Sequence, residues 1–305
     1  ITFASNTAVG GDLTLNTTSG GTAGAGIAFG GNITNGGTND LILIAGSGGA
    51  ITVAGSTSVT DLTLTSGASA VFTGNVTVND LITASTGTTI TLNGSANTFV
   101  AAVDFVNTGT VTLGNASSDQ STFGNGVDFS GNAALALQGT ITTTGDAVTF
   151  GTGGVTLGAA AAVATSGGLI NFESTLNGGQ NLTITAGSGN VTFAGAVGGS
   201  TRLGTLNIVS AGNVTVAPLT LAAFDQDAGT GTTTFGGDSG SFHPVNTNAS
   251  GGVVVENAVL VVNGAITTTN AGVVTLNQSG TTTLTAAGDI VSDGAVTITS
   301  GGGTT

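Results

Sequence analysis

The residues able to do chemistry are few in this chain, and most of them are carboxylates. The 305 residues include 15 Asp and Glu, one His and one Arg, but no Cys, Lys, Trp or Tyr. The densest charged group precedes the only histidine, His243, and contains Asp225, Asp227 and Asp238. Carboxylates can bind a cation such as Ca²⁺ or act as a general acid. These four residues are therefore weak candidates for a cation site, and the sequence predicts no other cofactor.

A polar loop explains the same group at least as well. The four residues span 19 positions and follow no ligand-spacing motif, whereas a metal site needs ligands that converge. The Gly-rich segments cannot form a phosphate loop of the Gly-x-x-x-x-Gly-Lys type because the chain has no Lys. The lone His has no nucleophile motif beside it. We therefore expect that the protein is not an enzyme and has no catalytic residue.

One further carboxylate pair is suggested by its spacing. Asp104 and Asp128 lie 24 residues apart, close to the repeat length derived below, so a repeating fold could stack them. General acid–base cleavage of glycosides needs two carboxyl groups within several ångströms. Other carboxylates are scattered, and several precede an apolar run, as in Asp12-Leu13 and Asp61-Leu62. This is a turn position, where Asp can bond its own backbone.

The charge balance narrows the classes of partner. The formal net charge is −14, and Arg202 is the only Lys or Arg. Nucleic-acid binding requires clustered Lys and Arg, and attraction to an anionic membrane surface requires them too. The sequence therefore excludes both partners, whereas multivalent cations are compatible with the charge. The longest run of small apolar residues, 159–164, is too short to cross a bilayer as a helix.

One tripeptide recurs along the chain: an aliphatic residue, then Thr, then an aliphatic residue or Phe. It occurs fifteen times, for example at Leu13-Thr14-Leu15, Val76-Thr77-Val78 and Val191-Thr192-Phe193. Successive side chains of a strand point to opposite faces, so the two apolar residues face one side and Thr the other. Gly-Asn, Asn-Gly and Gly-Gly pairs, typical of turns, separate the runs. No apolar i, i+3, i+4, i+7 stripe is present, so we expect an all-β protein without helix.

The tripeptides follow a longer period. Inward-facing anchors chosen between residues 13 and 296 are about 20 residues apart. A fixed period of 20 to 50 residues indicates a solenoid, a propeller or an array, and a propeller blade takes roughly 40 residues. A unit of about 20 residues with strands of three to five residues fits one turn of a parallel β-helix. We expect such rungs to stack at the spacing of paired strands, 4.7–4.9 Å.

Stacked rungs would place similar side chains above one another. Aliphatic residues would form inward ladders, Thr outward ladders and Asn amide ladders at the turns. Identical charges would repel at this spacing, which is a physical reason for so few charged residues. Some of the phenylalanines that close strands should stack as an aromatic ladder. These are Phe3, Phe150, Phe172, Phe193 and Phe235.

Two stretches resemble the repeats of a known class of surface protein. One runs from Thr183 to Gly199 (TITAGSGNVTFAGAVGG), and the other from Leu203 to Thr215 (LGTLNIVSAGNVT). Both resemble repeats of filamentous-haemagglutinin-like and autotransporter-passenger proteins of bacteria. The resemblance is loose over most of the chain and stronger over about residues 140–300. It implies a right-handed parallel β-helix, export across the outer membrane, an extracellular or cell-surface location, and a role in adhesion or surface architecture.

We expect one β-solenoid domain over residues 1–305. A polar loop is expected to interrupt it at about residues 224–250, and a flexible Gly-rich tail to end it at residues 300–305. No polar capping unit, of the kind that solenoids need for solubility, is recognisable at either end. The chain is therefore expected to continue in further rungs of a longer protein or to stack head to tail with copies of itself. Host or surface glycans are a further expected partner.

Three functions are compatible with these features. The preferred one is a structural component of an extracellular bacterial fibre, sheath or surface adhesin that assembles by end-to-end stacking. The first alternative is a β-helix that binds or cleaves carbohydrate, which the absence of Trp and Tyr disfavours. The second alternative is an ice-binding solenoid, suggested by flat Thr ladders such as Thr63, Thr77 and Thr91.

Overall fold

The chain folds as a parallel β-solenoid. The computed structural model describes residues 1–35 and 38–235 in full and, between residues 241 and 300, the backbone of the strands. About 52% of the chain is strand, and the sheets are parallel. None of the described residues is helical, so none of them forms a helix long and apolar enough to cross a membrane. The all-β parallel solenoid expected from the sequence is confirmed.

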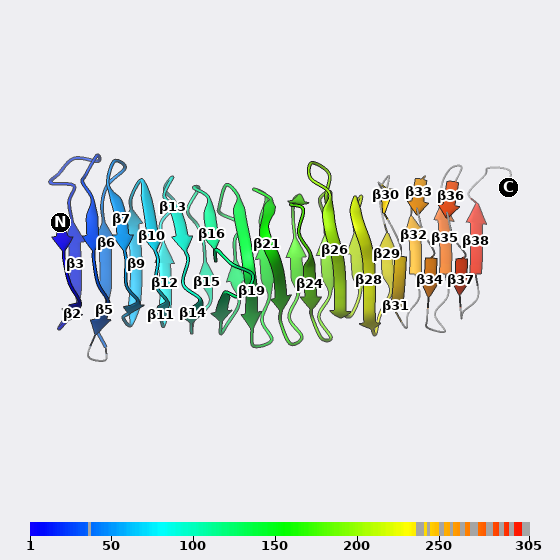
Figure 1. Cartoon of the computed structure of the whole chain (residues 1–305), viewed down its shortest axis with the longest axis horizontal. Helices are drawn as coiled ribbons and strands as arrows, with labels where there is room; N and C mark the ends of the chain where they lie inside the picture. Colours follow the sequence, from blue (N-terminus) through cyan, green and yellow to red (C-terminus); the bar gives the residue numbers. More distant parts are fainter. Residues whose placement is uncertain are drawn as a thin grey trace. The chain divides into compact units, whose positions relative to one another are not determined.

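Two compact units make up the chain. Unit 1 comprises Ile1–Gly153 and unit 2 comprises Gly154–Thr305. Within each unit, successive rungs lie side by side and contribute short strands to parallel stacks (Figure 1). The single domain expected from the sequence stays a prediction, and residues 301–305 of the expected tail lie outside the described residues.

Each rung of unit 1 adds one strand to each of three stacks, so the rung is three-sided. The first stack contains β1 (Thr2–Phe3), β4 (Ile27–Phe29), β7 (Ala50–Val53), β10 (Ser69–Phe72), β13 (Thr89–Leu92), β16 (Val111–Leu113) and the start of β19 (Leu135–Thr143). The second contains β2 (Thr7–Val9), β5 (Ile33–Asn35), β8 (Thr57–Ser58), β11 (Val76–Val78), β14 (Ala96–Phe99), β17 (Gln120–Phe123) and the end of β19. The third contains β3 (Leu13–Asn16), β6 (Leu41–Ile44), β9 (Asp61–Ser66) and β12 (Asp80–Thr83), followed by β15 (Val103–Asp104), β18 (Val127–Asp128) and β20 (Val148–Phe150).

Rung length varies around the predicted value. Val76 pairs with Thr57, 19 residues earlier, whereas Leu13 pairs with Leu41, 28 residues later. The long first rung contains a loop of ten residues, 17–26, between β3 and β4. The strands keep their register despite this loop because extra residues at a corner leave the paired strands unchanged.

Unit 2 is built in the same way. One stack contains β22 (Ile170–Phe172), β25 (Val191–Phe193), β27 (Val214–Val216), β29 (Thr233–Phe235), β32 (Val253–Glu256), β35 (Val274–Gln278) and β38 (Val296–Ser300). A second contains the end of β21 (Val155–Ala164), β24 (Leu182–Thr185), β26 (Leu203–Ser210), β28 (Leu221–Gly229), β31 (Val245–Ala249), β34 (Ile266–Thr268) and β37 (Ile290–Ser292). The remaining strands are β23 (Leu176–Asn177), which pairs with the start of β21, and β30 (Ser241–Phe242), β33 (Val259–Val262) and β36 (Thr283–Ala286). Strands therefore continue through the described part of the range 224–250, where the sequence predicts a polar loop.

Aliphatic ladders fill the interior, as the alternation of the tripeptides predicts. In the first stack of unit 1, the inward positions of five successive rungs are fully buried and pair directly. These positions are Ile27, Ile51, Ala70, Ile90 and Val111. Removing such apolar area from water is the main favourable contribution to folding. Each rung therefore depends on its neighbours, because one rung alone has nothing to cover these side chains.

Phenylalanines stack between rungs at several positions. The rings of Phe3 and Phe29 lie 4.7 Å apart and nearly parallel, and Phe172 stacks on Phe193 at the same distance. The expected aromatic ladder is thus confirmed for Phe3, Phe150, Phe172 and Phe193, since Phe150 stacks on its neighbour Phe129. Phe235 instead meets Phe224 edge-on, at 5.1 Å and 76°.

Asparagines at corners hold each rung to the next. The Asn6 side-chain carbonyl accepts a hydrogen bond from the Asn32 backbone N–H, and the Asn32 side chain accepts one from Ser56. The same chain of bonds links Asn190 to Asn213 in unit 2. A Cβ on Gly212 would lie only 2.7 Å from the Asn190 Oδ1, which explains why Gly precedes Asn at this turn. Asparagine ladders are therefore present, but they join side chain to backbone rather than amide to amide.

Candidate functional site

Carboxylates gather on the third stack of unit 1. Six of the eight Asp residues of this unit lie there, and four of them occupy equivalent positions on successive rungs. Asp61 pairs with Asp80, and the pairing of Leu41 with the neighbouring leucines places Asp40 level with Asp12 and Asp61. We call Asp12, Asp40, Asp61 and Asp80 the acidic ladder. The expectation that identical charges avoid stacking is wrong at these positions.

Local bonds and burial explain how the acidic ladder is held. The Asp40 backbone N–H donates to the Asp12 carboxylate (3.1 Å), so this Asp bonds the next rung rather than its own turn. Burial raises the pKa of Asp80, and the negative charge of Asp61 beside it raises the pKa further. A hydrogen bond from the Leu81 backbone acts in the opposite direction. The ladder therefore favours partial protonation of its inner members.

A second carboxylate group lies farther along the same stack. Asp104 on β15 pairs with Asp128 on β18, as their spacing suggested. Together with Asp146 they line a shallow groove of about 330 Å³. Burial raises the pKa of Asp104, and the charge of Asp128 raises it further. The Asp128 carboxylate accepts a hydrogen bond from the Ser130 backbone N–H (2.7 Å), an interaction within its own turn.

This carboxylate groove can share a proton between neighbouring carboxyl groups, the kind of difference that separates acid and base roles in enzymes. Its other lining residues are small, aliphatic or amide side chains, and none is aromatic. Carbohydrate sites commonly need a flat apolar surface for the sugar ring, since ligand pockets are mostly apolar with few polar groups. The groove thus supplies the carboxylates of the carbohydrate alternative without such a surface.

The structure brings together only part of the candidate cation site. Asp225 and Asp227 lie on β28 and point outward, on either side of the buried Gln226. Gln226 accepts a hydrogen bond from the Thr233 hydroxyl (2.6 Å) inside the solenoid. Asp238 and His243 lie outside the described residues. Among the residues that the structure describes, no group of three or more acidic or His side chains is placed to hold a metal ion.

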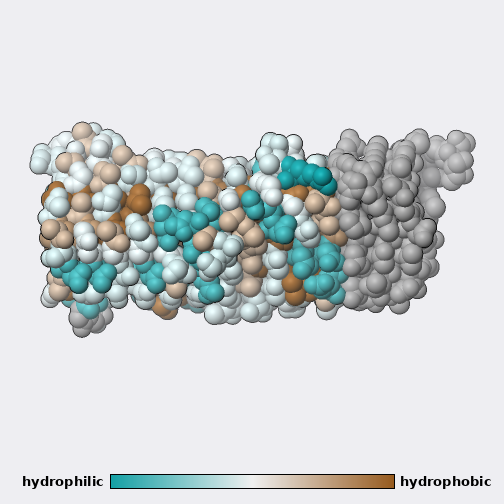
Figure 2. All heavy atoms as spheres, viewed as in Figure 1, coloured by the Kyte–Doolittle hydropathy of each residue, from teal (hydrophilic) through white to brown (hydrophobic). Residues whose placement is uncertain are grey.

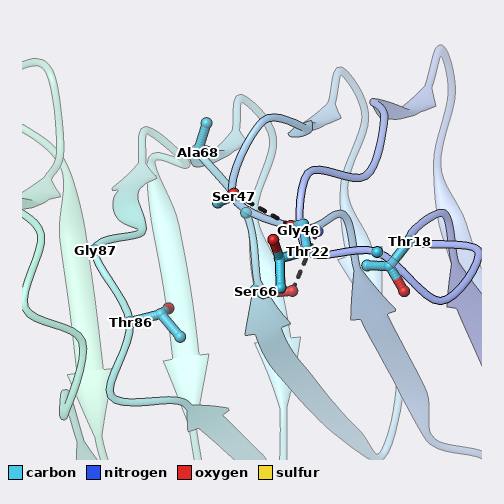
Figure 3. A pocket seen from close by; sticks show the side chains of 10 residues that line it. Thr18, Thr22, Gly46, Ser47, Ser66, Ala68, Thr86 and Gly87 are labelled. Atoms are coloured by element: carbon cyan, nitrogen blue, oxygen red, sulfur yellow. Dashed lines mark hydrogen bonds between the residues drawn. The ribbon is translucent and has the colours of Figure 1, made fainter.

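The largest cleft among those that stand out in unit 1 lies beside the loop of residues 17–26 (Figure 3). It has a volume of about 420 Å³ and is lined by Gly, Ala and hydroxyl side chains, among them Thr18, Thr22, Ser47 and Ser66. The Ser66 hydroxyl accepts a bond from the Gly46 backbone, and the Ser47 hydroxyl donates to the Thr22 carbonyl. These hydroxyls already serve the fold, and no titratable side chain lines the cleft. It offers room for a small neutral molecule but no group that could activate one.

The three threonines named as a flat ladder lie on different stacks. Thr63 is on β9 in the third stack, Thr77 on β11 in the second and Thr91 on β13 in the first. The expected ladder of these three residues is therefore wrong. Spacing alone misassigned them because each rung carries three similar strands, and a shift of about 14 residues moves to the next side of the same solenoid.

The acidic ladder was not recognised from the sequence, although a signal for it exists. The dipeptide Asp-Leu occurs at residues 12, 40, 61 and 80, at intervals that match the rungs. Each Leu is the first inward residue of its strand, which fixes the preceding Asp at the same corner. Aligning the dipeptides rather than the tripeptides would have found the ladder.

Comparisons with known proteins give no relative. No family model matches the chain, and neither does any curated protein or solved structure. The resemblance to filamentous-haemagglutinin-like repeats therefore stays a prediction. The functional argument depends on the geometry of this chain alone.

Proposed function

We propose that the protein is a structural component of an extracellular bacterial fibre, sheath or surface adhesin, and that it extends by end-to-end stacking of rungs. The observation that carries this proposal is the repetition of the pairing edge. Ser69 of β10 pairs with Ala50 of β7 on one side and with Thr89 of β13 on the other. Each rung thus presents to the next the same register that it received from the previous one.

This repetition makes a rung complementary to another copy. The edge of a parallel strand exposes backbone N–H and C=O groups that pair readily with a further strand. Inward ladders such as Ile51, Ala70 and Ile90 would continue across the junction and bury more apolar area. Solenoids are stabilised by these interfaces between neighbouring repeats, so a longer stack is a more stable one.

Composition supports a location outside the cell. The chain has no Cys and so does not depend on disulfides. Arg202 is the only Lys or Arg, which leaves trypsin-like proteases a single site. The described surface shown in Figure 2 is mostly of intermediate hydropathy, with separate hydrophilic patches. Such a surface suits contact with other neutral surfaces, including surface glycans.

Blocking one strand edge tests the proposal. Ala28 and Gly30 of β4 donate hydrogen bonds to the carbonyls of Ile1 and Phe3, so the Thr2 backbone N–H faces the opposite edge, because neighbouring residues of a strand point their backbone groups to opposite sides. Thr2→Pro removes that N–H without breaking the bonds to β4, and Thr2→Ala is the matched control that keeps it.

Electron microscopy and sedimentation of the purified chain give the readout. We expect the wild-type chain and Thr2→Ala to form linear assemblies that grow with concentration, and Thr2→Pro to form fewer and shorter ones. Compact wild-type monomers at every concentration would contradict the proposal, and so would assembly of Thr2→Pro equal to that of the wild type.

A further inference from the structure

A continuous column of hydroxyl side chains runs along the second stack of unit 1. One Thr or Ser points outward from the same position on six successive strands, from β5 to β19. Each is paired with the next in parallel register. We call these residues the hydroxyl ladder: Thr34, Ser58, Thr77, Thr98, Thr122 and Thr142. Only Thr77 belongs to the set of threonines expected from the sequence.

The hydroxyl ladder faces solvent and serves no visible internal purpose. Its first four residues are exposed and the last two are half-buried. None of the six hydroxyls has a hydrogen-bond partner among the residues that the structure describes. Hydroxyls elsewhere in the unit differ, since Thr88 and Thr83 bond the backbone of neighbouring rungs. The ladder therefore keeps its donors and acceptors for something outside the protein.

The surroundings of the ladder are regular and uncharged. The pairings along it show no register shift, whereas the third stack has one between Leu43 and Ile44. None of the strands that carry the ladder contains a charged residue. The acidic ladder and the pair Asp104 and Asp128 lie on the third stack instead. The carboxylates are thus kept away from the hydroxyl ladder.

We propose that the hydroxyl ladder is an ice-binding surface. Parallel strands repeat every 4.7–4.9 Å, close to the oxygen repeat along one axis of the ice surface. Each Thr offers a hydroxyl that can both donate and accept a hydrogen bond, together with a methyl group that fits between ordered waters. An uncharged array matches an uncharged lattice, because a fixed carboxylate would orient water around itself.

Ice fits the ladder better than two other occupants. A polysaccharide would gain from aromatic rings that stack on its sugars, but the chain has no Trp or Tyr. A second copy of the chain would need an apolar surface to bury, whereas interfaces gain most from a hydrophobic core. Ordered water needs neither, and its repeat in one direction is supplied by the six in-register rungs.

The test compares one outward substitution on two stacks. Thr98→Arg places a long charged side chain in the middle of the hydroxyl ladder. Thr52→Arg is the matched control, because Thr52 is also an exposed outward Thr but lies on β7 of the first stack. Thermal hysteresis and inhibition of ice recrystallisation are measured for the full chain, and circular dichroism confirms that both variants fold.

We expect activity in the wild type, near-complete loss in Thr98→Arg, and retention in Thr52→Arg. Absence of both activities in the wild type would overturn the inference, as would equal loss in the two variants. Binding to crystalline cellulose or chitin without any effect on ice would assign the ladder to polysaccharide instead. Filament formation is measured separately, so failure of this inference leaves the proposed structural role open to its own test.

Discussion

Removal of one interior ring tests whether stacked rungs stabilise the solenoid. Phe123 on β17 is fully buried. Its ring stacks on Phe99 of the adjacent rung, with centroids 4.8 Å apart and an interplanar angle of 11°. It also meets Phe129 edge-on, at 6.4 Å and 87°. Phe123→Ala therefore removes a buried ring and two aromatic contacts at once.

The size of the effect follows from these contacts. Replacing a buried Phe by Ala costs about 3–5 kcal/mol in unfolding free energy, and two favourable ring pairs place this site at about 4–5 kcal/mol. Phe123→Leu keeps most of the apolar volume and loses mainly the ring contacts, so we expect about 1–2 kcal/mol. Phe3→Ala is a control, because Phe3 is only half-buried and stacks on Phe29 alone. We expect it to cost about half as much as Phe123→Ala.

Urea denaturation followed by far-ultraviolet circular dichroism measures these differences, since the chain has no Trp or Tyr to report by fluorescence. The order of destabilisation should be Phe123→Ala, then Phe3→Ala, then Phe123→Leu or close to it. A loss below about 1.5 kcal/mol for Phe123→Ala would refute the reasoning, because the site would then collapse without cost. Equal losses for the Ala and Leu variants at residue 123 would show that volume does not matter there.

Two further predictions concern the corners and the carboxylates. Asn213→Ala removes the acceptor for a backbone N–H of the next rung and should cost about 0.5–1.5 kcal/mol in urea denaturation, whereas Asn213→Asp should retain most of that stability and Thr215→Ala should stay within about 0.5 kcal/mol of the wild type. The raised pKa of Asp80 contributes stability that is present below its unfolded pKa and lost as pH rises through its folded pKa. Lowering the pH from 7 towards about 4 should therefore raise the denaturation midpoint through this group. Asp61→Asn should weaken that pH dependence, and Asp146→Asn, which removes the same charge elsewhere, should leave it; equal effects of the two variants would contradict the pairing.

The sequence predicted the strands and their stacking because the tripeptides encode both. Val191-Thr192-Phe193 reads as inward, outward, inward, and forms β25 with that burial pattern. The rung length was also predictable, since apolar anchors must recur wherever the chain returns to the same side. The three-sided shape was not, because the spacing of the anchors reports only complete turns.

Positions within the rung were harder to predict than the rungs themselves. Corner segments vary in length, as the loop of residues 17–26 shows, so a residue number does not identify a side of the solenoid. Thr63, Thr77 and Thr91 were therefore grouped wrongly, whereas Asp104 and Asp128 were matched because the rung between them has an ordinary length. Asp146 joins that groove from a corner after β19, and spacing gives no signal for a residue of this kind.

The scarcity of charge and the acidic ladder have one physical origin. In a solenoid, any residue type that recurs at one position becomes a column at strand spacing, so its effect accumulates over the rungs. A column of carboxylates makes one side of unit 1 strongly polar and mutually repulsive, and the raised pKa of Asp80 is the local sign of that repulsion. A column of hydroxyls makes another side neutral and regular. Concentrating the carboxylates on the third stack therefore lets one side provide solubility while the second stack remains available for contact with an ordered neutral surface.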